Sequence, residues 1–103
     1  KHIEPVDLWI DRAVLHFFTN PKEQENYFDL LSNTVKSNGY VILAQFNTDS
    51  AKFCSGLPVY QYSKVLLEKY IGSGFTLIDS FNYTYTMPSG DKREYIYTLF
   101  KKN

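Results

Sequence analysis

Cysteine is scarce in this sequence, and long apolar runs are absent. The chain of 103 residues has one cysteine, Cys54, which excludes a disulfide within the chain and fits a reducing compartment. No apolar run approaches the ~20 residues that span a bilayer. Residues 1–5 contain no apolar segment of the kind that signal peptides carry. We therefore expect a cytoplasmic protein without a membrane partner.

An excess of charge of one sign is also missing, because 11 Lys and Arg residues match 11 Asp and Glu residues. Nucleic-acid binding depends on many Lys and Arg contacts with phosphates, so we expect no nucleic-acid partner. No metal is expected either, since His2, His16 and Cys54 are too widely separated to form a recognisable ligand set.

The sequence does contain alternating strand and helix patterns. Nearly continuous apolar residues predict buried strands at 6–10 and 40–46, the second covered on both faces. A short helix or turn is expected over 12–18. Asn20-Pro21 is typical of a helix start, and Asn38-Gly39 is typical of a left-handed cap at the end of that helix.

The second half continues the alternation. Residues 47–62 predict a long irregular loop, and such loops are usually functional or disordered. Ser63 is expected to cap a second helix that stops at Gly72. Alternating residues in 75–87 and 94–100 then predict an antiparallel hairpin, rich in aromatic residues. The order β-α-α-β-α-β-β predicts an α/β fold in which two parallel strands are extended by a pair with one antiparallel member.

The placed elements resemble part of a known family. Residues 7–17, with the step Asp11-Arg12-Ala13, are similar to the fourth strand and following loop of class I S-adenosylmethionine-dependent methyltransferases. The resemblance is greatest to the thiopurine-methyltransferase-like branch, which acts on small molecules. Residues 36–43 resemble the approach to strand five, with Asn38-Gly39 as a variant of the usual turn. Residues 54–59 with Tyr62 resemble the next loop, and the final hairpin resembles strands six and seven.

This resemblance implies one domain over 1–103 that corresponds to the C-terminal half of a Rossmann-like methyltransferase sheet. The family's Gly-rich turn after strand one and its acidic residue at the end of strand two hold the donor, and neither is found here. The complete domain would transfer a methyl group from S-adenosylmethionine to a small-molecule acceptor by in-line displacement. We expect the isolated chain to bind the donor weakly or not at all, and to be inactive alone.

The resemblance also implies roles for three residues after the first strand. Arg12 would orient an acceptor, Asp11 would lie beside acceptor and donor, and His16 would assist as a neutral base. The four-residue spacing from Arg12 to His16 predicts one helical face. The alternatives are that Asp11 caps the short helix and pairs with Arg12 or a neighbour, and that His16 packs among Leu15, Phe17 and Phe18.

The loop after the second strand supplies the remaining candidates. Cys54, Ser55 and Gly56, with Tyr60 and Tyr62, would line the acceptor pocket. A nucleophilic role for Cys54 would need a base and a group that orients it, and the sequence offers no matching set.

A different hypothesis makes the chain an interaction module. If Val6–Ile10 is an edge strand, its unpaired backbone and apolar side chains form a template for another strand. Self-association, or pairing with a separate N-terminal half, is then expected at this edge.

Overall fold

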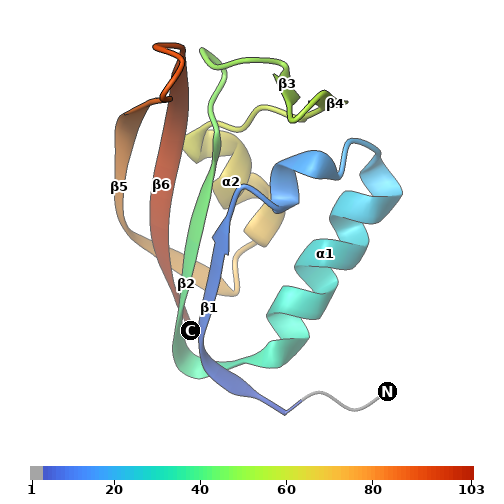
Figure 1. Cartoon of the computed structure of the whole chain (residues 1–103). Coiled ribbons are helices and arrows are strands. Elements are labelled where there is room, and N and C mark those ends of the chain that lie inside the picture. Colours follow the sequence, from blue (N-terminus) through green and yellow to red (C-terminus); the bar gives the residue numbers. More distant parts are fainter. Residues whose placement is uncertain (1–3) are drawn as a thin grey trace.

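The computed structural model describes residues 4–103, so His2 lies outside them. Its main sheet has the strand order β1-β2-β6-β5 (Figure 1). Strands β1 and β2 are parallel, whereas β6 is antiparallel to both of its neighbours. The bounds are Val6–Arg12 for β1, Val35–Phe46 for β2, Phe75–Thr86 for β5 and Lys92–Lys102 for β6. The predicted α/β fold with one reversed strand is confirmed.

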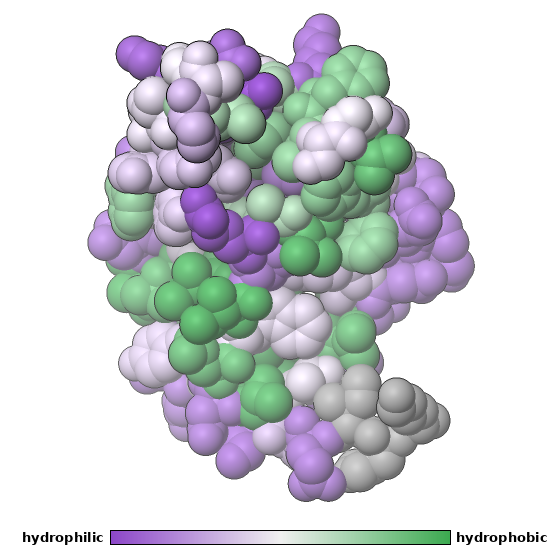
Figure 2. Space-filling model, viewed as in Figure 1, coloured by the Kyte–Doolittle hydropathy of each residue, from purple (hydrophilic) through white to green (hydrophobic). Residues whose placement is uncertain are grey.

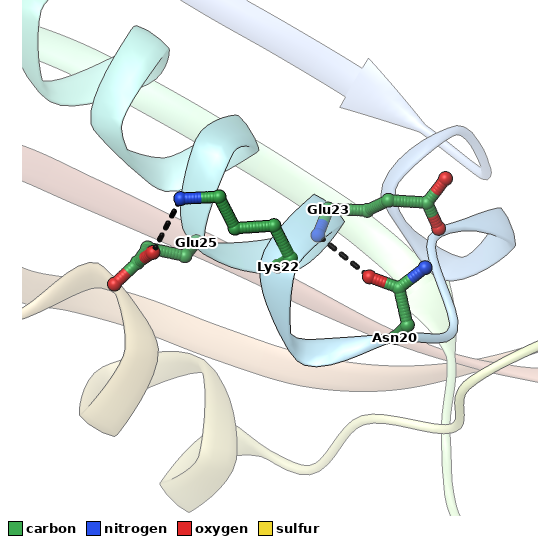
Figure 3. A network of polar contacts seen from close by, with 4 residues as sticks. All are labelled: Asn20, Lys22, Glu23 and Glu25. Atoms are coloured by element: carbon green, nitrogen blue, oxygen red, sulfur yellow. Dashed lines mark hydrogen bonds and ion pairs between the residues drawn. The ribbon is translucent and has the colours of Figure 1, made fainter.

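Two helices begin where the sequence predicts. The side chain of Asn20 accepts a hydrogen bond from the Glu23 backbone N–H at 2.8 Å and starts α1, Pro21–Thr34 (Figure 3). Ser63 does the same for Leu66 at 3.1 Å and starts α2, Lys64–Ile71. Each cap satisfies a backbone N–H that has no partner within its helix.

The end of α1 differs from the prediction. The helix stops at Thr34, and Val35 already belongs to β2 and is buried. Asn38 has the expected left-handed backbone, with φ of 69°, but it lies where the pairing of β1 with β2 shifts register. A Cβ on Gly39 would lie 2.9 Å from the Lys36 carbonyl oxygen. The Asn-Gly pair therefore forms an irregularity against β1 rather than a helix cap.

The main hydrophobic core lies on one face of the sheet, which we call the covered face, and a smaller buried cluster of Ala44, Phe46 and Tyr95 lies on the other. Both helices and a short 3-10 helix, η1 (Leu15–Phe17), pack on the covered face (Figure 1). The core residues with no measurable exposure are Leu15, Leu31, Val41, Leu43, Tyr62 and Leu67.

The other face, the open face, carries no helix within residues 4–103. Leu8, Ile10 and Tyr40 remain 48%, 64% and 42% exposed. In Figure 2 hydrophobic side chains gather over β1 and β2. The prediction that 40–46 is covered on both faces is therefore wrong toward its start, because the described helices supply only one layer.

The segment 47–62 is more regular than predicted. It contains a hairpin of two short strands, β3 (Phe53–Cys54) and β4 (Leu57–Pro58). Ser55 and Gly56 form its turn with φ of 54° and 80°, as tight hairpin turns require. A parallel bridge from Asn47 to Tyr62 returns the chain to the sheet.

The last strand is fastened to the first long helix. Lys102 Nζ donates to the carbonyl oxygens of Ser32 at 2.5 Å and Val35 at 2.8 Å. These are carbonyls at the C-terminal end of α1, where a positive charge is favourable. Within the described residues, neither helix has the length and apolar character needed to cross a bilayer.

Candidate functional site

The candidate site lies where β1 ends. Asp11 pairs in register with Leu43 of β2, and Arg12 pairs with Ala44. Because successive side chains of a strand point to opposite faces, the two charged residues separate. Asp11 is 5% exposed on the covered face, whereas Arg12 is exposed on the open face.

This arrangement corrects the expectation that Arg12 and His16 share a helical face. Arg12 belongs to β1, and His16 lies in η1 and is fully buried. The four-residue spacing is not helical because the strand continues to Arg12 and only a single 3-10 turn follows. The alternative pairing of Asp11 with Arg12 does not form.

Asp11 holds the backbone that follows it. Its carboxylate accepts hydrogen bonds from the backbone N–H groups of Val14 at 2.9 Å and Leu15 at 3.0 Å. It also accepts a short bond of 2.5 Å from the Tyr27 hydroxyl of α1. That hydroxyl in turn accepts from the Trp9 ring N–H at 3.1 Å. Burial, followed by the bond to Asp11, raises the pKa of Tyr27. Asp11 thus joins β1, η1 and α1.

His16 is a neutral, buried group. The backbone N–H of Phe46 donates to its Nδ1 at 3.2 Å, so the ring proton belongs on Nε2. Its own backbone N–H donates to Gln45 Oε1 at 3.1 Å. Burial lowers the pKa of His16 to about 4, against the opposing effect of Asp11. The ring packs 4.5 Å from the ring of Phe46 and 4.8 Å from that of Phe17, measured between centroids.

Three buried polar atoms in this region have no hydrogen-bond partner among residues 4–103. They are His16 Nε2, Gln45 Nε2 and the Tyr62 hydroxyl. Burial also raises the pKa of Tyr62, which keeps its hydroxyl protonated. We call the five buried polar residues of the covered face at this end of β1 the inner polar cluster. They are Asp11, His16, Tyr27, Gln45 and Tyr62.

Arg12 lies among tyrosines on the open face. Its Nε donates to the Tyr97 hydroxyl at 3.1 Å. Its guanidinium carbon lies 5.3 Å from the centre of the Tyr95 ring and 5.8 Å from that of Tyr85. The bond to Tyr97 raises the pKa of Arg12. We call Arg12, Tyr85, Tyr95 and Tyr97 the outer arginine cluster.

The predicted site residues of the loop lie in two places, beside the outer arginine cluster and on the covered face. Cys54 packs against Ala44, Phe46 and Tyr95, next to the outer arginine cluster, and carries the Ser55-Gly56 turn with it. Tyr60 and Tyr62 belong with the covered face. The Tyr60 hydroxyl lies 3.0 Å from that of Tyr70 on α2, a contact that raises the pKa of Tyr60.

The structure adds residues that sequence reasoning did not single out, namely Tyr27, Gln45, Tyr85, Tyr95 and Tyr97. In the final hairpin, the alternation of residues along the strand indicates that Tyr95 and Tyr97 share a face. Only the register, which pairs Tyr97 with Ala44 and Ala44 with Arg12, brings that face to the arginine.

Asp11 is the predicted donor contact, and both of its carboxylate oxygens already accept hydrogen bonds from other residues of the chain. Residues 4–103 also bring together no group of three His, Cys, Asp or Glu side chains that fits a metal ion.

Solved structures with the same fold include methyltransferases. A S-adenosylmethionine-dependent methyltransferase from Methanosarcina mazei matches 98% of this chain and 61% of its own, with 14% identity and a TM-score of 0.77. The N-methyltransferase NodS of Bradyrhizobium japonicum matches 99% and 53%, with 9% identity and a TM-score of 0.72. TehB of Haemophilus influenzae matches 99% and 37%, with 15% identity and a TM-score of 0.70.

These likenesses establish the fold. NodS has also been solved in complex with S-adenosyl-L-homocysteine. The chain spans about half the length of the structures it matches, from 37% to 61%. No family model matches the sequence, and no curated protein matches it.

Proposed function

We propose that residues 1–103 form the acceptor side of a S-adenosylmethionine-dependent methyltransferase domain that acts on a small molecule. The observation that carries the proposal is the strand order β1-β2-β6-β5 with β6 reversed. This order corresponds to strands four, five, seven and six of the family that the sequence resembles. Structures of methyltransferases with the same fold support it.

The chemistry at the carboxyl end of β1 is consistent with an acceptor site. Ligands of open α/β sheets bind outside the carboxyl ends of strands, and Arg12 is exposed there. In the proposal Arg12 contacts the acceptor, while Asp11 and His16 position the turn that carries Ala13 and Val14. The β3–β4 hairpin with Cys54 lies against the same end and shields the acceptor. In the proposal the chain belongs to the thiopurine-methyltransferase-like branch, and the step Asp11-Arg12-Ala13 supports this.

In this proposal the donor is held by residues outside 1–103. The support is that both carboxylate oxygens of Asp11 already accept hydrogen bonds, and that residues 1–103 contain no Gly-rich strand–helix turn. Isothermal titration of the chain with S-adenosylmethionine should therefore give no saturable heat at micromolar concentrations. Micromolar binding by the chain alone would overturn this division of the domain.

The function itself is tested with the product of the whole reading frame. The coding sequence upstream of Lys1 should encode a Gly-rich strand–helix turn. That product should transfer label from methyl-labelled S-adenosylmethionine to one of a panel of small thiols, phenols and amines. Arg12→Gln should reduce the transfer, and Arg93→Gln, the matched removal of the other arginine's charge, should not. An upstream frame without that turn, together with no transfer, would refute the proposal.

A second candidate is an interaction module, favoured by the free edge of β1. Within residues 4–103, β1 pairs only with β2, and Leu8 and Ile10 are 48% and 64% exposed. Such an edge pairs readily with another strand. We expect sedimentation to show concentration-dependent association that Ile10→Lys abolishes. A monomer at every concentration counts against this candidate.

A further inference from the structure

The Arg12 side chain is a positive charge without a negative partner. Among residues 4–103 its single side-chain hydrogen bond is to the neutral Tyr97 hydroxyl, and no carboxylate contributes to its pKa. Exposed arginines are long and flexible, and fixing one costs conformational entropy. Three tyrosines from β5 and β6 nevertheless hold this one in place.

The way Arg12 is held determines which of its groups remain available. Nε is occupied by Tyr97, which leaves the two terminal amino groups of the guanidinium. These two groups form a fork that matches a carboxylate in a bidentate, coplanar pair. The guanidinium carbon also lies over the rings of Tyr85 and Tyr95, so two aromatic faces lie beside the fork. A carboxylate that pairs with both terminal amino groups approaches in the plane of the guanidinium, from the end away from Nε.

The surroundings favour a flat ligand. A flat body attached to such a carboxylate has aromatic rings nearby, because the centres of the Tyr95 and Tyr85 rings are 5.3 Å and 5.8 Å from the guanidinium carbon. Aromatic groups stack well on such rings, and the neighbouring pair of Phe81 and Tyr97 shows this, with ring centres 5.0 Å apart and planes inclined by 6°. A tetrahedral phosphate cannot place all its oxygens in the guanidinium plane, and its remaining oxygens would face the electron-rich rings.

We propose that the outer arginine cluster binds an aromatic carboxylate, with the carboxylate on Arg12 and the ring against Tyr85 and Tyr95. The proposal rests on the proposed function in taking this ligand as the methyl acceptor. It defines the acceptor by charge and shape, as a planar acid rather than a phosphate or a neutral compound.

The side-chain Nε–H resonances of arginine test it directly, because the sequence has two arginines, Arg12 and Arg93. Titration of the chain with benzoate should shift the Arg12 resonance saturably and leave that of Arg93 in place. Cyclohexanecarboxylate keeps the charge without the flat ring, and inorganic phosphate keeps a charge without the planar head. Both should bind more weakly than benzoate. Benzyl alcohol should not bind.

Variants provide the second part of the test. Arg12→Lys keeps the charge but loses the fork, and should weaken benzoate binding on the order of tenfold, the value of one charge-assisted hydrogen bond. Arg93→Lys makes the same exchange at an arginine that pairs with Tyr85 across the strands but bonds its neighbour's carbonyl oxygen, and should weaken binding less than Arg12→Lys does. No Arg12 shift, phosphate binding as tight as benzoate, or equal effects of the two variants would each overturn the proposal.

The measurement separates this inference from the proposed function because it needs no methyl donor. Benzoate binding by the chain, with no methyl transfer by the product of the whole reading frame, leaves the carboxylate site intact and refutes the enzyme. Transfer to neutral acceptors alone, with no benzoate binding, supports the enzyme and refutes the carboxylate site.

Discussion

The covered and open faces of the sheet are built from alternate residues of the same strands, yet they hold their polar groups in different ways. On the covered face, Asp11 is fixed by three hydrogen bonds inside the core. On the open face, its neighbour Arg12 is fixed by tyrosine rings and one hydroxyl. Adjacent residues in one strand thus differ in role, because Asp11 is structural and Arg12, in our proposal, binds a ligand.

The comparison shows where stability and binding reside. The covered face buries apolar side chains from both helices and three strands, whereas the open face leaves Ile10 and Phe81 more than half exposed. Changes in the core behind the sheet should therefore lower the free energy of unfolding, and changes at the exposed residues in front should leave it nearly unchanged.

The largest difference is expected for apolar side chains. Leu43 is fully buried, and Leu43→Ala should lower the free energy of unfolding by about 2–5 kcal/mol because it leaves a cavity. Ile10 is 64% exposed, and Ile10→Thr, which keeps a branched side chain, should change it by less than about 0.5 kcal/mol. Urea denaturation measures the free energy of unfolding of both variants. Equal losses would mean that the open face is covered in solution.

The second effect concerns pH. Burial lowers the pKa of His16 from 6.5 to about 4, so between these values the unfolded chain binds a proton that the native chain does not. Stability should therefore fall as the pH drops through this window, by about 3 kcal/mol in total. The His16→Asn variant lacks the titrating ring and should lose less stability over the same window. Urea midpoints at several pH values measure the difference, and parallel curves for the two proteins would contradict it.

The smallest effect compares two tyrosine hydroxyls. Tyr27→Phe removes the hydroxyl that bonds Asp11 and Trp9 in the core, and should cost about 1–2 kcal/mol because buried partners lose a bond. Tyr97→Phe removes the hydroxyl that bonds exposed Arg12, and should cost less than about 0.5 kcal/mol. Thermal unfolding is sufficient to rank them. A greater loss from Tyr97→Phe would show that the outer arginine cluster is structural.

Much of the fold was predictable because its signals are local. The caps at Asn20 and Ser63 bond residues three positions away, and the final hairpin alternates along its own length. The end of α1 was not predictable in this way. Asn38-Gly39 has the composition of a helix cap, but pairing of β1 with Val35 begins the strand before it.

The candidate site was predictable only in part. The step Asp11-Arg12 was identified, but the strand was expected to end at Ile10, and this concealed the separation of the two side chains. The strand continues to Arg12, and its alternation then assigns one residue to each face. Tyr97 is 85 positions from Arg12, so only the register of three strands brings them together.

The position of β6 has a consequence for the order in which the protein forms during synthesis. Among the described strands β6 is synthesised last, yet it lies between β2 and β5. Until it emerges, β2 has one vacant side and β5 has no partner in the sheet. Lys102 then bonds the carbonyl oxygens of Ser32 and Val35, seventy and sixty-seven positions back. Because such distant contacts form slowly, the backbones of β2 and β5 in the nascent chain can pair with other chains until β6 is made.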